Sequence, residues 1–183
     1  PRSFCARSSP HLGRSKATRD LADQYARGDR MNEFKECLPL EVGIGARESL
    51  TVAPFHTVPE LDDTWPGFRD MPPVLATAMM IGFVEQTCVE ALRPYLRPQQ
   101  RTVGTHVNVS HLAPTPVGMN FEADVKLVEI NSNSLLFTVS CRDEAGLIGE
   151  GTHTRAIIDL QRFAQRANEK RERWKCSSAT RSI

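Results

Sequence analysis

A single carboxylate stands in the apolar segment ATAMMIGFVEQTC, which covers residues 76–88. This carboxylate is Glu85, and no other residue between Asp70 and Glu90 carries a formal charge. Because burying a carboxylate is costly unless it is paired or hydrogen-bonded, Glu85 needs a partner or a raised pKa. A carboxylate in such surroundings can act as a general base or a nucleophile. The alternative is a structural role, in which Glu85 caps a backbone group or reaches solvent.

His111 is the leading partner for Glu85, because it lies on the apolar face of the extended segment that follows. A Glu and His pair at the edge of a core can activate water or act as nucleophile and acid, since each group shifts the proton affinity of the other. The structural alternative is a core histidine whose hydrogen bonds are satisfied.

Thr77 is a third candidate, eight positions before Glu85. On one helix the two Cα atoms would be about 12 Å apart, too far for direct contact. The two residues can therefore serve one site only if Thr77 lies in an irregular lead-in, or if a second subunit completes the pocket. A threonine that bonds its own backbone at a helix start is the structural alternative.

Two further residues could position a ligand. Gly104 lies within an extended segment, where glycine marks either the close approach of a ligand or a bulge. Arg155 belongs to the run GEGTHTRA, residues 149–156, and shares a strand face with Gly151 and His153. A cation there could hold a carbonyl, a carboxylate or a phosphate, or it could be a solvated strand residue.

The element that carries Glu85 is predicted to be a helix over residues 74–89. Pro72 and Pro73 suit a helix start, the apolar run is long for a strand, and Pro94 marks the stop. The segment is apolar nearly all round, which predicts burial on most sides. A strand over residues 48–54 and a proline-punctuated loop are predicted to precede it.

Four extended segments follow the helix, and their alternation predicts antiparallel strands over residues 102–112, 119–130, 135–142 and 147–160. NSNS, residues 131–134, and DEAG, residues 143–146, have the composition of hairpin turns. One strand, a buried central helix and an antiparallel meander together predict an α+β fold in which a sheet wraps one helix.

Strand alternation in the first of these segments predicts its two faces. The face toward the helix is predicted to hold Val103, Val107, Val109 and His111. The opposite face is predicted to hold Thr102, His106, Asn108 and Ser110.

Composition and motifs exclude several functional classes. The formal net charge is +1, from 23 basic and 22 acidic residues, so neither nucleic acid nor an anionic membrane is an expected partner. The uncharged apolar stretch before Glu85, residues 71–84, is shorter than the roughly 20 apolar residues of a bilayer span. The five cysteines form no CxxC pair and the five histidines show no metal-ligand spacing, so no metal is expected. There is no GxSxG, GxxxxGK, HExxH or GxGxxG motif.

Composition also predicts three regions along the chain. Residues 1–30 form a disordered or targeting leader, because residues 1–19 hold five basic side chains and no acid. Residues 31–163 form one globular domain, and residues 164–183 form a charged tail that begins as a solvated helix and frays. The expected compartment is the cytoplasm, or the mitochondrial matrix if residues 1–30 are a transit peptide.

Three motifs, in this order, resemble the fluoroacetyl-CoA thioesterase family of hotdog-fold proteins: PPVLATAMMIGFVEQTC, VGTHVNVSHLAPTPVG and IGEGTHTRAIIDL. The resemblance covers about residues 42–163. It implies a hotdog fold, a homodimer with active sites at the subunit interface, and hydrolysis of acyl-CoA thioesters, with coenzyme A entering only as part of the substrate and no other cofactor. It also implies that Thr77, Glu85 and His111 form the catalytic set, and that Gly104 and Arg155 position the acyl end.

One position departs from the family pattern. Members selective for the fluorinated substrate use a pair of aromatic residues as a lid, whereas here Phe68 is followed by Met71 at the second position. Because methionine is flexible, a broader range of short acyl groups is expected. Two other functions stay open: a non-catalytic acyl-CoA-binding hotdog module, and a hotdog enoyl-CoA hydratase or dehydratase.

Overall fold

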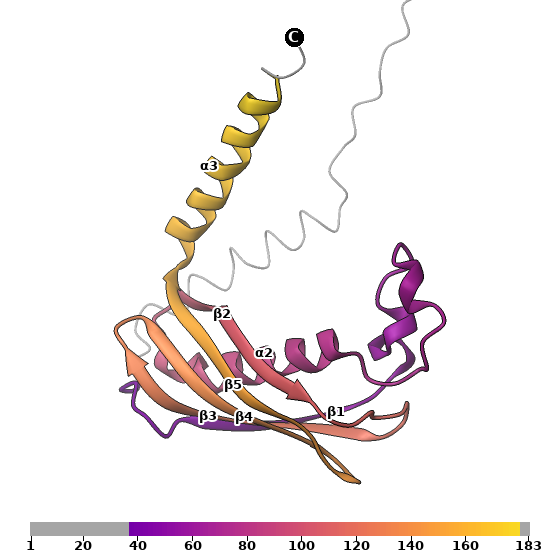
Figure 1. Cartoon of the computed structure of the whole chain (residues 1–183). Helices are drawn as coiled ribbons and strands as arrows, with labels where there is room; N and C mark the ends of the chain where they lie inside the picture. The colour runs from indigo at the N-terminus through magenta and orange to yellow at the C-terminus, as the bar shows by residue number, and fades with distance from the viewer. Residues whose placement is uncertain (1–36, 180–183) are drawn as a thin grey trace, which may run out of the picture. The chain divides into compact units, whose positions relative to one another are not determined.

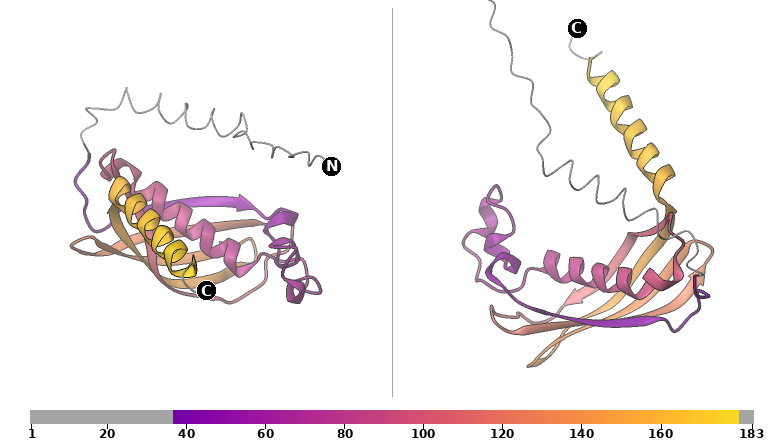
Figure 2. Two further views of the ribbon diagram at one scale, coloured as in Figure 1. Left: turned by 90° about the horizontal axis from the view of Figure 1, so that it is seen from above. Right: turned by 180° about the vertical axis from the view of Figure 1, so that it is seen from behind.

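The structure is a computed structural model that describes residues 37–179 (Figure 1). The leader predicted over residues 1–30 lies outside the described residues. Within the described part, one antiparallel sheet and one long helix packed on it form an α+β arrangement (Figures 1 and 2). This arrangement agrees with the fold class predicted from the sequence.

The sheet has five strands in the order β1-β3-β4-β5-β2. They are β1 (Gly45–Thr51), β2 (Gln100–His111), β3 (Asn120–Asn131), β4 (Ser134–Asp143) and β5 (Gly146–Asp159). The bounds of the last four strands lie within two residues of the prediction. Strand β1 begins and ends three residues earlier than predicted. Asn131 pairs with Ser134 and Asp143 with Gly146, so both predicted hairpins are confirmed.

The helix α2 (Thr77–Leu92) begins three residues later than predicted. The delay has a local cause: the N–H of Leu75 donates to the carbonyl of Thr115 at 2.8 Å, and Val74 forms a bridge with Pro116. These contacts hold the residues after Pro73 in extended form. The helix ends at Leu92 and passes into a 3-10 turn over Arg93–Tyr95, because Pro94 has no N–H with which to continue the α-helical hydrogen bonds.

The core lies between one face of α2 and the concave face of the sheet. Helical spacing places Met80, Val84, Cys88 and Leu92 on the buried face of α2. Against them pack fully buried residues of β3 and β4, including Phe121, Leu127, Leu135 and Phe137. Each such side chain contributes about 1.5–3 kcal/mol through burial.

The opposite face of α2 is open in the single chain, which corrects the prediction of burial on most sides. Thr77, Ala78, Gly82 and Gln86 are exposed, whereas every fourth residue from Met80 is buried.

The helix α3 (Leu160–Ala179) follows β5 without a loop. The side chain of Asp159 caps it, because its Oδ1 accepts a hydrogen bond from the N–H of Arg162 at 2.9 Å. Side chains from Leu160 to residue 177 are exposed, and the boundary predicted at residue 164 falls inside this helix. No helix within the described range, residues 37–179, is long and apolar enough to span a bilayer.

Candidate active site

The first cluster of chemically competent groups lies where α2 begins and β2 ends. Thr77 is the first residue of α2, and His111 is the last residue of β2. The Oγ1 atom of Thr77 is 2.8 Å from the Nδ1 atom of His111, a hydrogen-bonding distance. Which atom donates depends on the tautomer of His111: an unprotonated Nδ1 accepts the hydroxyl proton of Thr77, and this orients the hydroxyl.

The second nitrogen of His111, Nε2, is buried and has no hydrogen-bond partner among residues 37–179. Burial lowers the pKa of His111 below the ordinary histidine value, and a backbone hydrogen bond at Ala113 opposes this shift. The lowered pKa favours the neutral imidazole, in which Nε2 is the nitrogen that the described residues leave unsatisfied.

The second cluster surrounds Glu85, two turns further along α2. An Oε2 atom of Glu85 lies 3.4 Å from Nη1 of Arg155, and Oε1 lies 3.9 Å from Nε2 of His153. The side chain of Glu85 is 39% exposed, whereas those of Arg155 and His153 are only 3% and 1% exposed. Glu85 is thus partly exposed and contacts a buried cation, Arg155. This corrects the prediction that Glu85 is buried.

Hydrogen bonds fix the position of Arg155 and the tautomer of His153. Nδ1 of His153 donates to the carbonyl of His106 at 2.9 Å, because that oxygen can only accept. Nε2 of His153 must then accept from Nη1 of Arg155 at 3.0 Å. Burial lowers the pKa of His153, and the nearby Arg155 cation lowers it further, which keeps the ring neutral. Nε and Nη2 of Arg155 donate to the hydroxyl and the carbonyl of Thr102, each at 3.0 Å.

Gly104 allows the carboxylate of Glu85 to approach β2. A Cβ atom at this position would lie 2.6 Å from Oε1 of Glu85 and 3.0 Å from Cε1 of His153. Any side chain at position 104 would therefore displace Glu85. The sequence left two interpretations of Gly104 open, close approach and a bulge, and the structure supports both. The carboxylate of Glu85 approaches Gly104 closely, and the β2–β5 register shifts between Gly104 and His106.

The bulge changes which residues of β2 face the helix. Gly104 pairs with Arg155 and Val107 pairs with His153, so an extra residue lies between them. The predicted alternation is therefore wrong before the bulge: Thr102, which was assigned to the outer face, contacts Arg155 on the inner face, and Val103 points the other way. After the bulge the predicted inner face, with His111, is correct.

Sequence reasoning thus identified residues from both clusters, but within one chain the predicted Glu85–His111 contact is not formed. His111 contacts Thr77 and not Glu85, whose partners in the chain are Arg155 and His153. Because Thr77 is inside the helix, its Cα atom is about 12 Å from that of Glu85 along the axis. The first of the two conditions stated for a shared site, an irregular lead-in, is therefore not met.

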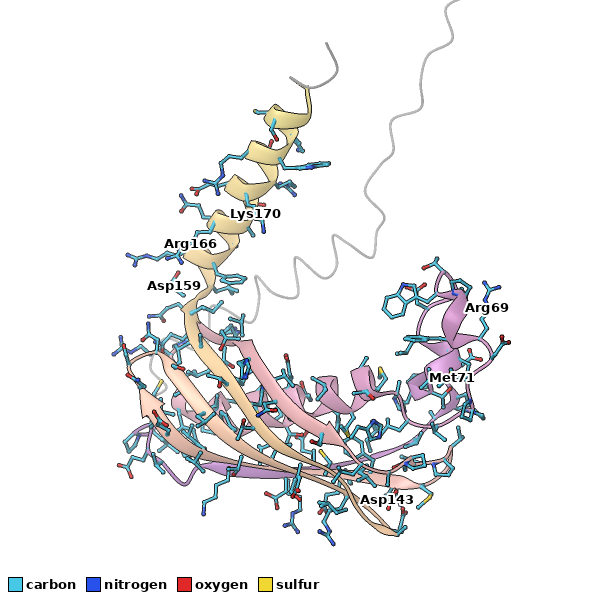
Figure 3. The ribbon with its side chains drawn as sticks, in the orientation of Figure 1. Arg69, Met71, Asp143, Asp159, Arg166 and Lys170 are labelled. Atoms are coloured by element: carbon cyan, nitrogen blue, oxygen red, sulfur yellow. The ribbon has the colours of Figure 1, made fainter. Side chains whose placement is uncertain are left out.

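Met71 lies on the segment that precedes α2 (Figure 3), and Phe68 ends a 3-10 turn, Pro66–Phe68, in the same segment. Two hydrogen bonds lie within this segment. The N–H of Met71 donates to the carbonyl of Phe68, and the guanidinium of Arg69 donates to the carbonyl of Asp63. Phe68 does have an aromatic partner, but it is Trp65, with ring centroids 5.4 Å apart and nearly perpendicular planes. Met71 is 48% exposed.

Three residues of these clusters were not predicted as site residues: His153, Thr102 and Trp65. His153 was visible in the GTHTRA run, where it alternates with Arg155. No pattern in the sequence distinguishes Thr102 or Trp65. A neighbouring cysteine, Cys88, is unsuited to nucleophilic attack, because burial raises the pKa of its thiol to about 12. Among residues 37–179 no group of three or more His, Cys, Asp or Glu side chains could hold a metal ion.

Comparisons with known proteins place this geometry among thioesterases. A family model described as "Fluoroacetyl-CoA-specific thioesterase" matches residues 60–161. A fluoroacetyl-CoA thioesterase from Streptantibioticus cattleyicolor is 36% identical over 131 residues, which make up 72% of this chain and 94% of that protein.

Solved structures agree with the sequence comparisons. A threonine-to-serine mutant of the thioesterase FlK, in complex with acetyl-CoA, is 35% identical with a TM-score of 0.70, and the match covers 72% of this chain and 98% of that one. A thioesterase superfamily member from Thermus thermophilus is 25% identical with a TM-score of 0.67, covering 75% of this chain and 98% of that one.

Proposed function

The chain belongs to the fluoroacetyl-CoA-specific thioesterase family, and from this premise we propose that it hydrolyses short-chain acyl-CoA thioesters to the free acid and coenzyme A. Membership makes it a hotdog-fold thioester hydrolase. The substrate range, the catalytic residues and the assembly are proposals that the geometry supports.

The observation that carries the proposal is the Thr77–His111 contact with its unpartnered Nε2 atom. Thr77 also lies at the N-terminus of α2, where Ala76 offers no side-chain cap to the first N–H groups. A thioester carbonyl bound there would find backbone donors for the negative charge that develops on its oxygen. Thr77 orients the group that reacts, and His111 carries the proton.

Glu85 supplies the base or the nucleophile. Either its carboxylate attacks the thioester carbon and water then hydrolyses the resulting acyl–glutamyl anhydride, or the carboxylate removes a proton from a water molecule that attacks the thioester carbon itself. The carbon–sulfur bond then breaks, and the coenzyme A thiolate takes up a proton delivered by His111. Arg155 and Gly104 position the acyl end, since the buried guanidinium lies 3.4 Å from Glu85 and position 104 leaves room beside it.

We further propose that the active site is completed across a homodimer. Thr77 and Glu85 of one chain are too far apart to act on one carbonyl directly. In a symmetric dimer with antiparallel α2 helices, the start of one helix lies beside the later turns of the other. Two features support this: β2 is an edge strand with unpaired backbone groups on one side, and the exposed face of α2 includes the small residues Ala78 and Gly82.

The acyl group is proposed to be short, with acetyl and fluoroacetyl both accepted. The relatives are named for fluoroacetyl-CoA, and one was solved with acetyl-CoA. Met71 lies on the segment that bears Phe68, and its flexible side chain adapts to small differences in acyl shape.

A thiol-release assay across acetyl-, fluoroacetyl-, propionyl- and longer acyl-CoAs tests the proposal. We expect hydrolysis of at least one short acyl-CoA without added metal and in the presence of EDTA. Glu85→Gln should retain the fold and lose most of this activity, because the amide cannot act as base or nucleophile. Background thiol release with every substrate, zinc dependence, or full activity in Glu85→Gln would each contradict it. Product analysis on an enoyl-CoA separates hydrolysis from hydration, which releases no thiol.

A further inference from the structure

A groove of about 390 Å³ lies away from both clusters, where the start of β2, the β3–β4 turn, the end of β5 and the start of α3 meet. Three arginines line it: Arg97 from the segment before β2, and Arg162 and Arg166 from α3. Figure 3 shows Asp159 and Arg166 at the junction of β5 and α3. The volume is in the range of about 300–1,000 Å³ that small-molecule sites occupy.

Backbone hydrogen bonds hold the walls of the groove together. The N–H of Leu160 donates to the carbonyl of Gln99 at 3.0 Å, which ties the start of α3 to the segment before β2. The N–H of Ile157 donates to the carbonyl of Asn133 at 2.8 Å, which ties β5 to the β3–β4 turn. The positions of the arginine backbones are therefore set by the fold.

The groove is positively charged. None of its three guanidinium groups forms an ion pair with a carboxylate of residues 37–179, in contrast to Arg93, which pairs with Glu90, and Arg155, which pairs with Glu85. The one carboxylate in the lining, Asp159, already accepts the N–H of Arg162 as the cap of α3. Three cations against one carboxylate leave an excess of two positive charges on the lining.

The lining suits a phosphorylated nucleotide. Guanidinium groups bind phosphate with two parallel N–H donors, and arginine is preferred where such bidentate contacts are needed. Phe163, which also lines the groove, is 44% exposed and offers a flat apolar face on which a nucleobase can stack.

We propose that this groove binds the adenine nucleotide end of coenzyme A, through its phosphate groups. The inference rests on the proposed function, because it assigns a second contact to the same substrate. It also gives α3, whose side chains are exposed along its length, a role in substrate binding.

The distance between the groove and the Glu85–Arg155 pair matches the length of the pantetheine arm of coenzyme A. Gln100 is four residues from Gly104 along β2, and Asp159 is four residues from Arg155 along β5. Four strand residues span about 13 Å. The pantetheine arm has about as many chain bonds as four to five amino-acid residues, so it extends to about 15 Å. A thioester beside Glu85 and Arg155 can therefore place its phosphates in the groove.

Two substrates that differ only in the nucleotide test the inference. We compare acetyl-CoA with S-acetylpantetheine in the whole chain and in the double variant Arg97→Gln/Arg166→Gln, which keeps polar side chains but removes two of the three positive charges of the lining. The control is Lys126→Gln/Arg142→Gln, which removes two charges from exposed positions on β3 and β4.

For acetyl-CoA we expect the groove variant to raise KM about tenfold or more with kcat unchanged, because the lost contact binds ground state and transition state alike. For S-acetylpantetheine we expect no change in kcat/KM. The control should behave as the wild type with both substrates. Equal losses on the two substrates, or no loss on acetyl-CoA, would overturn the assignment.

A binding measurement separates this inference from the proposed function. By calorimetry, adenosine 3′,5′-bisphosphate should bind the wild type and the control, and its affinity should fall about tenfold in the groove variant. Equal affinity of wild type and groove variant for the bisphosphate contradicts the nucleotide site even if hydrolysis is observed. The nucleotide site is also contradicted if inorganic phosphate binds as tightly as the bisphosphate. Absence of thiol release from both thioesters contradicts the proposed function, whereas selective bisphosphate binding would still support the site.

Discussion

Thr77 and His111 come from opposite ends of their elements, the first residue of α2 and the last residue of β2, and their side chains are 2.8 Å apart. Within residues 37–179 the Nε2 atom of His111 is buried and has no hydrogen-bond partner. A polar atom in this state is costly unless a bound molecule satisfies it. Under the proposed function we expect the substrate or a water molecule to be that partner.

The hydroxyl of Thr77 can be tested by substitutions that keep its shape. Thr77→Val preserves volume but cannot hydrogen-bond Nδ1, so kcat should fall about 10²–10⁴-fold. Thr77→Ser restores the hydroxyl and should retain most activity. The control is Thr138→Val, at an exposed position of β4, which should leave kcat unchanged. If Thr77→Val turns over acetyl-CoA at the wild-type rate, the hydroxyl has no catalytic role.

The pH dependence of kcat/KM should report His111. Burial lowers its pKa below the ordinary value of about 6.5, so the neutral form that accepts a proton persists to lower pH. Activity should therefore be level around pH 7 and fall on an acidic limb with a midpoint below about 6.5. The profile is measured on acetyl-CoA from pH 4.5 to 8. A midpoint above 6.5 would mean that another group, or a charged His111, controls the reaction.

The composite site can be tested by mixing inactive variants. If Thr77 of one subunit acts with Glu85 of the other, a dimer of one Thr77→Ala chain and one Glu85→Gln chain has one intact site and one doubly defective site. Random reassembly of equal amounts makes half of the dimers mixed, so the mixture should recover about one quarter of wild-type activity.

The control for this experiment is each variant unfolded and refolded alone, which should remain inactive. Recovery requires subunit exchange, which mass spectrometry of differently tagged chains can verify. If mixed dimers form and activity stays at the level of the separate variants, both residues act within one chain, and the composite site is wrong.

Two glycines of the sheet should respond differently to alanine. At Gly104 the added Cβ meets Oε1 of Glu85 at 2.6 Å, and this side chain can move because it is 39% exposed. At Gly149 the added Cβ meets the carbonyl of Ser110 at 2.7 Å, a backbone atom that cannot. Gly104→Ala should therefore lose activity at least tenfold with little change in the free energy of unfolding. Gly149→Ala should be destabilised by about 1–3 kcal/mol. Thermal melts and kcat/KM for both variants check this contrast, and an active Gly104→Ala enzyme would contradict it.

The segment that bears Phe68 and Met71 should influence acyl selectivity. A methylene-sized change in an apolar pocket is worth about 1–3 kcal/mol, and a rigid ring removes space that methionine can vacate. Met71→Phe should lose more activity on propionyl-CoA than on acetyl- or fluoroacetyl-CoA. Equal changes in kcat/KM for all three substrates would show that Met71 does not contact the acyl group.

Trp65 provides a second test of the same segment. Its ring packs edge-on against Phe68 with centroids 5.4 Å apart, and half of its surface is exposed. Trp65→Ala should leave the fold intact and reduce discrimination between acetyl- and propionyl-CoA, because Phe68 loses the contact that orients it. A variant with wild-type discrimination would indicate that the aromatic pair only stabilises the segment.

The sequence by itself determined the elements and most of the chemistry. Two prolines and a long apolar run indicated the helix that carries Glu85, and period-two alternation with polar turns indicated β3, β4 and β5 within two residues. These signals are local, because they depend on backbone preferences and on which side chains repeat with one spacing. The lone charge of Glu85 was visible for the same reason.

Only the tertiary structure decided which of these residues meet. One extra residue in β2 between Gly104 and His106 brings Thr102 onto the inner face, where it holds Arg155, and no alternation rule anticipates that residue. The hydrogen bond from the N–H of Leu75 to the carbonyl of Thr115 fixes where α2 begins. This brings the side chain of Thr77 to His111. Glu85 is left two turns away beside Arg155 and His153. Contacts between distant segments depend on register and on where each element starts, and a shift of one residue in either changes every partner.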